Sequence, residues 1–146
     1  MGGPDPGAPS PALRHITRQY LNLSYGRHPL QAVDLYLPEE GNPPFPTLIL
    51  VHGGGFSRCD KRDLSVYCFY AAGGFALASV NYRLVPEYRF PCQIHDVKAA
   101  IRFLKGHAGE YGLDPRSFFL YGDSAGGYLV SMVGATQHGS SLDSGA

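Results

Sequence analysis

Residues 47–51 (TLILV) are continuously apolar and run directly into the four residues HGGG (52–55). This junction constrains the fold more than any other part of the sequence. A short apolar run without alternation is typical of a strand that is covered on both faces in a parallel sheet. We therefore expect a layered α/β structure in which the HGGG loop begins at the carboxyl end of a buried strand.

Strand and helix patterns alternate through the later half of the chain. Further apolar strands are predicted over 75–81 and 117–121, and helices over the segments between and after them, 63–72, 94–104 and 124–133. This alternation is typical of a parallel sheet with right-handed crossovers. The sequence thus predicts the α/β class, with helices flanking a mostly parallel sheet.

The earlier part of the chain has a different pattern. Two short strands are predicted over 16–24 and 32–37, joined by a turn, and they form an N-terminal antiparallel hairpin. Apolar and polar residues alternate in the second strand, which predicts a half-exposed strand. In the predicted helix over 94–104, Asp96 and Lys98 are expected on other faces than the apolar stripe. Asp96 either pairs with the loop over 82–91 or is solvated.

The six residues GDSAGG (122–127) stand where the strand over 117–121 turns into a helix. A serine on such a tight turn projects its hydroxyl, and flanking glycines remove the Cβ atoms that would clash beneath it. The helix that begins there also points its N–H groups and positive end at the reacting centre. Gly-x-Ser-x-Gly alone is a weak motif in a chain with 19 glycines. Its position between strand and helix makes Ser124 a candidate nucleophile.

The HGGG loop supplies what such a serine needs. Acyl transfer develops negative charge on a carbonyl oxygen, and each preorganised N–H donor stabilises it by roughly 2.7–4 kcal/mol. Glycines also cradle phosphate, but neither GxxxxGK[ST] nor GxGxxG accompanies them. His52 and Ser124 are 72 positions apart, which fits two strand-plus-helix units of roughly 30 residues or more. Both loops are therefore expected at one edge of the sheet.

HGGGF (52–56), NYRLVPE (81–87) with FP (90–91), and GDSAGG (122–127) together resemble the hormone-sensitive-lipase-like branch of the α/β-hydrolase esterases. Residues 88–128 are most similar to bacterial feruloyl/acetyl esterase-like members. The resemblance implies an α/β-hydrolase fold and carboxylic-ester hydrolysis with no metal and no organic cofactor. Carried over by position, it implies Ser124 as nucleophile, N–H groups of Gly54, Gly55 and Ala125 as the oxyanion hole, and His52, Gly53, Tyr82 and Arg83 as support for the loops.

The resemblance also implies two residues that this chain does not supply. The family takes its triad acid and histidine from strands after the nucleophile. Only 22 residues follow Ser124, and His138 would lie roughly 21 Å away if the helix continued. We therefore expect a C-terminally truncated, incomplete α/β-hydrolase fold that is weak or inactive alone, because an unassisted serine is a poor nucleophile. The alternative is an inactive fragment or pseudoenzyme that acts as an interaction module.

The composition excludes other classes of function. Because 12 Lys+Arg balance 12 Asp+Glu, neither nucleic acid nor an anionic membrane is an expected partner. No apolar run approaches the roughly 18 residues of a membrane span. The three cysteines lack CxxC spacing, so free thiols are expected, and no signal peptide is visible. These features predict a cytoplasmic protein, and the resemblance implies a small-molecule ester as its partner.

The chain divides into three parts. Residues 1–14 are predicted to be a flexible leader, 15–136 the N-terminal part of an α/β-hydrolase domain, and 137–146 a polar tail. In the family's sheet the strand over 117–121 is interior, whereas in this chain it is expected to be an exposed apolar edge. Because such an edge pairs readily with other chains, we expect self-association.

Overall fold

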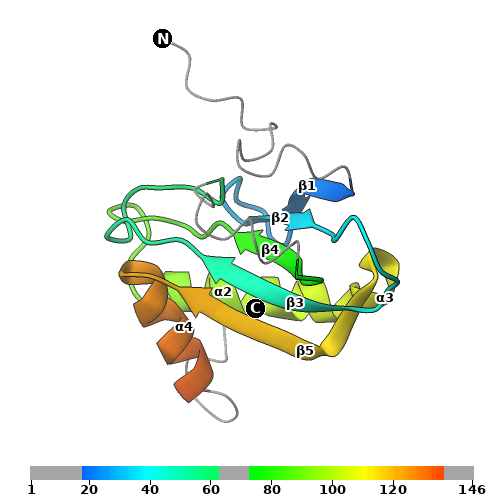
Figure 1. Cartoon of the computed structure of the whole chain (residues 1–146). Coiled ribbons are helices and arrows are strands. Elements are labelled where there is room, and N and C mark those ends of the chain that lie inside the picture. Colours follow the sequence, from blue (N-terminus) through cyan, green and yellow to red (C-terminus); the bar gives the residue numbers. More distant parts are fainter. Residues whose placement is uncertain (1–17, 63–72, 137–146) are drawn as a thin grey trace.

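The computed structural model describes residues 18–62 and 73–136. Within these ranges the chain forms one five-stranded sheet flanked by helices (Figure 1). The elements are β1 (Gln19–Ser24), β2 (Ala32–Tyr36), β3 (Phe45–Val51), β4 (Ala76–Val80), α2 (Cys92–Gly106), α3 (Ala108–Tyr111), β5 (Leu113–Gly122) and α4 (Ala125–Ala135). The predicted leader over 1–14, helix over 63–72 and tail over 137–146 lie outside the described residues.

The sheet combines an antiparallel hairpin with a parallel part. Its order is β1-β2-β4-β3-β5. The hairpin strands β1 and β2 are antiparallel, and β2 is antiparallel to β4. Strand β3 lies parallel to both β4 and β5. This arrangement is the predicted α/β-hydrolase type of architecture, with the N-terminal hairpin joined to a parallel sheet by β4.

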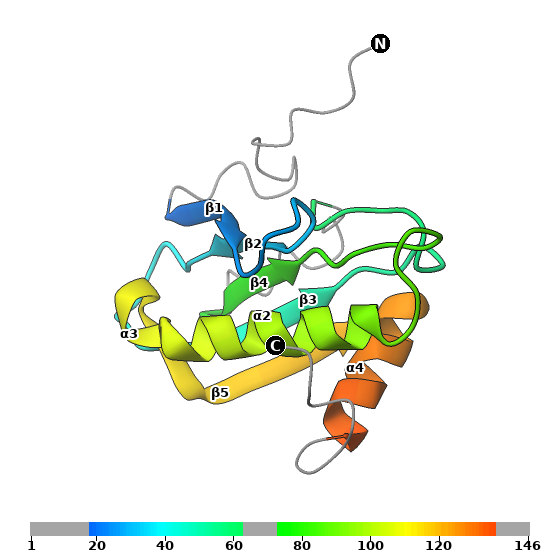
Figure 2. The same cartoon turned by 180° about the vertical axis from the view of Figure 1, so that it is seen from behind.

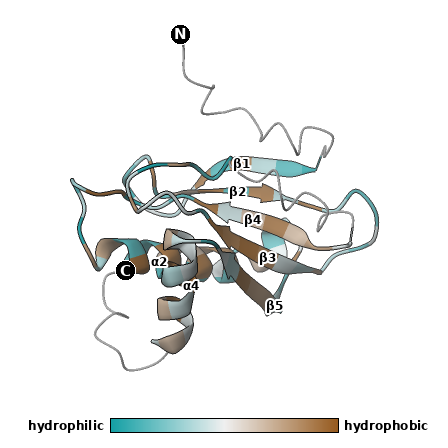
Figure 3. Cartoon of the chain, turned by 60° about the vertical axis from the view of Figure 1, so that its left-hand side comes forward, coloured by the Kyte–Doolittle hydropathy of each residue, from teal (hydrophilic) through white to brown (hydrophobic). Residues whose placement is uncertain are grey.

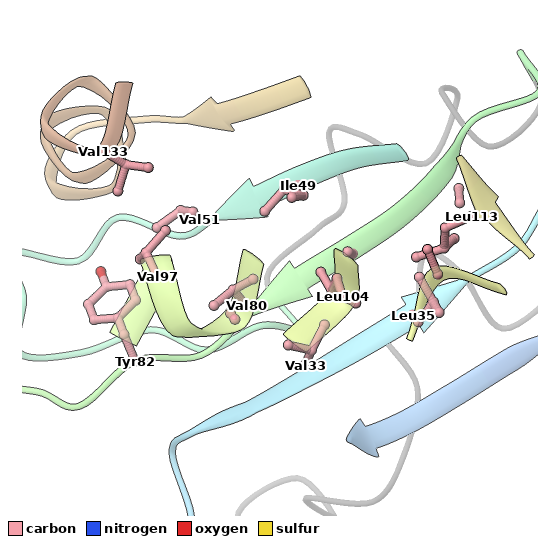
Figure 4. Packing of buried hydrophobic residues seen from close by; sticks show 14 of the residues in the cluster. Val33, Leu35, Ile49, Val51, Val80, Tyr82, Val97, Leu104, Leu113 and Val133 are labelled. Carbon is pink, nitrogen blue, oxygen red and sulfur yellow. The ribbon is translucent and has the colours of Figure 1, made fainter. Parts of the chain in front are cut away.

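The core lies between the sheet and α2, which crosses one face of it (Figure 2). The predicted apolar stripe of this helix faces the strands, and Ile94, Val97 and Leu104 are fully buried. All three belong to one cluster with β-branched and leucine side chains from the sheet, and Figure 4 shows Val97 and Leu104 in it. Burial of such a side chain contributes about 1.5–3 kcal/mol to folding, so this layer stabilises the sheet.

The prediction that residues 32–37 form a half-exposed strand is wrong. All five residues of β2 are buried, so both faces of this strand are covered rather than one. Asp34 is tolerated there since Lys61 forms an ion pair with it, with 3.1 Å between Lys61 Nζ and Asp34 Oδ2. Burial nevertheless raises the pKa of Asp34.

The sequence predicts Asp96 and Lys98 on other faces of α2 than its apolar stripe, but it does not predict their burial. Both side chains are buried. Lys98 Nζ donates a hydrogen bond of 2.7 Å to the carbonyl oxygen of Thr136, just beyond the C-terminus of α4. Asp96 pairs with the loop over 82–91 through Arg83, so the open question about Asp96 is resolved in favour of pairing. A charged residue on a helix can thus face inward where a partner neutralises it.

Strand β5 is longer than predicted and forms one edge of the described sheet. Its residues 118–120 are apolar (Figure 3), and Phe119 and Tyr121 on it are exposed. Among the described residues, Phe119 forms one ring contact, an edge-on contact with Phe75, and their centroids are 6.0 Å apart.

In residues 18–62 and 73–136, no helix is long and apolar enough to cross a membrane.

Candidate active site

The carboxyl ends of three parallel strands lie level with one another. Val51, the last residue of β3, is paired with both Val80 in β4 and Gly122 in β5. The loops that begin at His52 and Asp123 therefore leave the same edge of the sheet (Figure 1). This is the edge at which parallel α/β sheets bind their ligands.

Ser124 occupies a strained turn between β5 and α4. Its backbone has φ 51° and ψ −120°, a conformation that costs a non-glycine residue about 1–3 kcal/mol. The turn closes tightly, because a Cβ on Gly122 would come within 3.0 Å of the backbone of Gly126. The turn therefore needs glycine at both positions. Ser124, at the tip of the turn, is exposed.

The HGGG loop lies directly against this turn. A Cβ on Gly53 would be 2.8 Å from the Asp123 carbonyl oxygen and 3.3 Å from Ser124 Cβ. From the other side, a Cβ on Gly126 would be 2.8 Å from the carbonyl oxygen of His52. The two motifs, far apart in the sequence, thus meet backbone to backbone, as the spacing predicts.

Two of the three predicted oxyanion donors, Gly55 and Ala125, share a cavity with the serine. Gly54 and Gly55 have φ values of 110° and 62°, which glycine adopts without strain. Gly55, Ser124 and Ala125 line one cavity of about 460 Å³, whereas Gly54 is not in its lining. Within the described ranges, the N–H groups of Gly54, Gly55 and Ala125 donate no backbone hydrogen bond. These three N–H groups are therefore not used by backbone hydrogen bonds of the fold.

His52 and Tyr82 brace the base of the loop. Their rings stack with centroids 4.4 Å apart and 12° between planes. Tyr82 Oη donates a 2.7 Å hydrogen bond to the carbonyl oxygen of His52, and His52 Nδ1 lies 2.7 Å from the carbonyl oxygen of Gly53. Burial raises the pKa of Tyr82, so this hydroxyl stays a neutral donor.

Arg83 holds the loop over 82–91 against α2. Its guanidinium forms a two-pronged ion pair with Asp96, with 2.8 Å between Nη2 and Oδ1 and 2.9 Å between Nε and Oδ2. The hydrogen bonds to Asp96 raise the pKa of Arg83. The guanidinium also lies over the ring of Tyr88, 4.9 Å from its centroid. These contacts fix one wall of the cavity.

Sequence reasoning missed a second anchor of the HGGG loop, at Asn81. Its Oδ1 accepts a 2.8 Å hydrogen bond from Lys61 N, and its Nδ2 donates a 2.9 Å bond to Asp60 Oδ2. Both carboxamide ends are thus used to tie residues that follow the loop to the end of β4. The sequence signals are that Asn81 directly follows a buried strand and begins the NYRLVPE motif.

Histidines of the described ranges lie away from the serine hydroxyl or are engaged in the fold. His28 Nδ1 accepts from Leu30 N, and His107 Nδ1 lies 2.8 Å from the Phe103 carbonyl oxygen. Neither these nor His95 lines the cavity. No cluster of three His, Cys, Asp or Glu side chains in residues 18–62 and 73–136 could hold a metal ion.

Comparison with known proteins agrees with this geometry. The BD-FAE family model matches residues 33–146. Esterase LipC of Mycobacterium tuberculosis (strain ATCC 25618 / H37Rv) is 34% identical over 131 residues, which are 86% of this chain and 32% of that protein. Carboxylesterase NlhH of M. tuberculosis (strain CDC 1551 / Oshkosh) is 38% identical over 104 residues, 69% of this chain and 32% of that protein.

A solved structure shares the fold. Esterase B from Lactobacillus rhamnosis (HN001) superimposes with a TM-score of 0.79 at 33% identity, covering 85% of this chain and 41% of that one. This chain spans about a third of the length of the curated relatives named above. Since the family model matches most of the chain and the relatives are named esterases, the protein belongs to the BD-FAE family.

Proposed function

We propose that this chain is the nucleophile-bearing part of a serine carboxylic-ester hydrolase. Ser124 Oγ attacks the acyl carbon of an ester and forms a tetrahedral intermediate. The N–H groups of Gly54, Gly55 and Ala125 bind the negatively charged oxygen of that intermediate. The alcohol then leaves, and water hydrolyses the acyl group from Ser124. No metal or organic cofactor takes part in this scheme.

One observation carries this proposal: Ser124 is exposed on a strained turn that touches the HGGG loop. A strained backbone at a serine is costly, and here it presents the hydroxyl to a cavity whose wall includes Gly55 and Ala125. Preorganised N–H groups at such a position are usually the largest single contribution to acyl transfer.

The proposal leaves the general base to be supplied. Ser124 must lose its proton during attack, and no histidine in the described ranges lines the cavity. Loss of the histidine in a well-studied protease lowers kcat by about a million-fold. We therefore propose that the isolated chain hydrolyses esters weakly or not at all, while Ser124 retains its own position and its oxyanion donors.

A second candidate is an inactive module that binds another chain through β5. Exposed Phe119 and Tyr121 on this edge strand favour it, because unpaired backbone groups on an apolar edge template strand pairing. In this second candidate, the GDSAGG turn is part of the fold, but Ser124 does not react with esters. The two candidates differ in the reactivity of Ser124.

A fluorophosphonate probe tests the proposed function. Because no histidine in the described ranges lines the cavity, we expect labelling to be slow. After long incubation with excess probe, intact mass spectrometry and peptide mapping are expected to find the adduct on Ser124 of the unaltered chain, and Ser124→Ala is expected to abolish it. Ser131→Ala is the matched control, because Ser131 is an exposed serine on the same helix. An unreactive Ser124 would contradict the proposal and favour the binding module. Rapid Ser124-dependent turnover of p-nitrophenyl acetate would contradict the predicted weakness of the isolated chain.

A further inference from the structure

The cavity beside Ser124 is mainly apolar but contains one buried polar side chain that the proposed chemistry does not use. Its apolar lining comes from Phe56, Val85, Phe90, Ala125 and Leu129. Besides Ser124, the polar side chains in the lining are Tyr128 and Gln93. Tyr128 is 45% exposed, whereas Gln93 is only 4% exposed. A buried carboxamide in an apolar wall is expected to form hydrogen bonds with both its nitrogen and its oxygen.

The nitrogen of this carboxamide is hydrogen-bonded to the loop over 83–88. Gln93 Nε2 donates one hydrogen bond to the Arg83 carbonyl oxygen at 3.0 Å and another to the Tyr88 carbonyl oxygen at 2.8 Å. An amide nitrogen has two hydrogens, so both are used. The two acceptors also fix the orientation of the side chain, because a flipped amide would place its oxygen against two carbonyl oxygens.

The oxygen of the same carboxamide has no such partner. Across residues 18–62 and 73–136, no donor hydrogen bonds to Gln93 Oε1, and the oxygen is not among the fully enclosed atoms that lack one. It therefore keeps accessible surface, and the surface that Gln93 lines is the cavity. The nitrogen is used by the fold, and the oxygen is left for a ligand.

We propose that this cavity selects esters whose enclosed group is mainly apolar but carries one hydrogen-bond donor, a hydroxyl or an N–H, that binds Gln93 Oε1. The inference rests on the proposed function, because the cavity opens at Ser124. A pure hydrocarbon group would displace water from Oε1 and leave the acceptor unpaired, which is costly. A donor on the ligand replaces that water, while Phe56, Phe90 and Leu129 enclose the apolar remainder.

Two aromatic ligands of similar shape test the preference without any reaction at Ser124. We would titrate the full chain, ¹⁵N-labelled, with 4-methylphenol, which carries a donor, and with 4-fluorotoluene, which does not. We expect 4-methylphenol to bind about tenfold more tightly and to shift the side-chain NH2 resonances of Gln93. Equal affinities, binding of neither ligand, or shifts confined to other surfaces would overturn the proposal.

Two variants assign the preference to Gln93. Gln93→Met removes the acceptor at similar volume, so the affinity ratio is expected to fall toward one. Phe90→Leu trims an apolar wall, so both ligands are expected to bind more weakly at an unchanged ratio. A tenfold ratio that persists in folded Gln93→Met would overturn the proposal. Because the Gln93 amide also anchors the 83–88 loop, that variant can unfold, and the ligand pair on the unaltered chain then decides.

This test separates the inference from the proposed function. Reversible binding does not need the serine hydroxyl, so Ser124→Ala is expected to keep the tenfold ratio. A retained ratio with no fluorophosphonate adduct would overturn the proposed function alone. Labelling of Ser124 with no preference between the two ligands would overturn the inference alone.

Discussion

Gly126 in α4 packs its Cα against the carbonyl oxygen of Val51 at the end of β3. A Cβ on Gly126 would lie closer than 3.0 Å to that oxygen, a separation that real side chains do not adopt. Glycine is therefore needed at position 126 for the close contact with β3 as well as for the turn around Ser124. The serine turn and the HGGG loop are held together by a contact between two backbones.

Gly126→Ala is therefore expected to destabilise the fold. The added methyl group must push α4 away from β3, and overpacking of this kind costs about 1–3 kcal/mol. Urea unfolding followed by circular dichroism measures the change. Gly134→Ala on the same helix is the control, since nothing lies within 4 Å of its Cβ position. That variant is expected to stabilise the helix by up to about 1 kcal/mol, and equal effects of the two substitutions would contradict the packing argument.

The strain at Ser124 makes a second prediction. Because glycine adopts positive φ freely, Ser124→Gly is expected to raise the free energy of unfolding by about 1 kcal/mol, although it removes the nucleophile. Ser124→Ala removes the same hydroxyl but keeps a Cβ in the strained conformation, so it is expected to bring no such gain. Urea unfolding of both variants checks this, and equal stability would show that the turn stores no strain.

Local patterns in the sequence predict the parts of the site that local geometry determines. The apolar run before His52 and the glycines around Ser124 indicate a strand end and a tight turn, and both are where they were predicted. That both lie at one edge follows from the parallel α/β architecture. The pairing of Val51 with Gly122 is a long-range register that no local pattern encodes.

Residues that act through distant partners could not be predicted in the same way. The alternating pattern of residues 32–37 predicts an exposed Asp34. Its burial could not be predicted, because its neutralising partner Lys61 lies 27 positions later in an irregular loop. Gln93 is one polar residue at the start of a helix, and its role depends on the carbonyl oxygens of a loop that folds back over it. Such roles follow from tertiary contacts rather than from periodicity.

Asp60 makes the anchor of the HGGG loop sensitive to acid. Burial by itself would raise the pKa of Asp60, but hydrogen bonds from Asn81 Nδ2 and Arg62 N and the charge of Lys61 lower it overall. A carboxyl group with a lowered pKa stabilises the fold above its ordinary value of 3.8. That contribution is lost as the pH falls below 3.8 and through the lowered value.

Asp60→Asn tests this sensitivity. Asp60 accepts from Asn81 at Oδ2 and from Arg62 N at Oδ1, whereas asparagine has only one acceptor oxygen. The variant is therefore expected to lose about 1–2 kcal/mol at pH 7. The difference from the unaltered chain is expected to shrink as the pH falls below about 4, which urea unfolding across a pH series measures. Glu110→Gln removes an exposed carboxylate as the control. A difference that stays constant down to pH 2 would contradict the assignment to Asp60 ionisation.

The two edges of the described sheet differ in the residues that they expose. On β5, Phe119 is 52% exposed and Tyr121 follows two positions later on the same side of the strand. On β1, Tyr20 is exposed but packs edge-on against Tyr111, with centroids 4.8 Å apart. Because β5 exposes two aromatic rings and β1 exposes one, β5 is the more favourable of the two edges for pairing with another copy.

Phe119→Lys is therefore expected to reduce self-association of this chain. A charge on the exposed side of β5 opposes close approach of a second edge strand, which is how natural edge strands avoid pairing. Sedimentation velocity over a concentration series is expected to show concentration-dependent association in the unaltered chain and a shift toward monomer in Phe119→Lys. Tyr20→Lys places the same charge on the opposite edge and is expected to leave association unchanged. A monomeric unaltered chain, or equal effects of the two lysines, would exclude β5 as the associating edge.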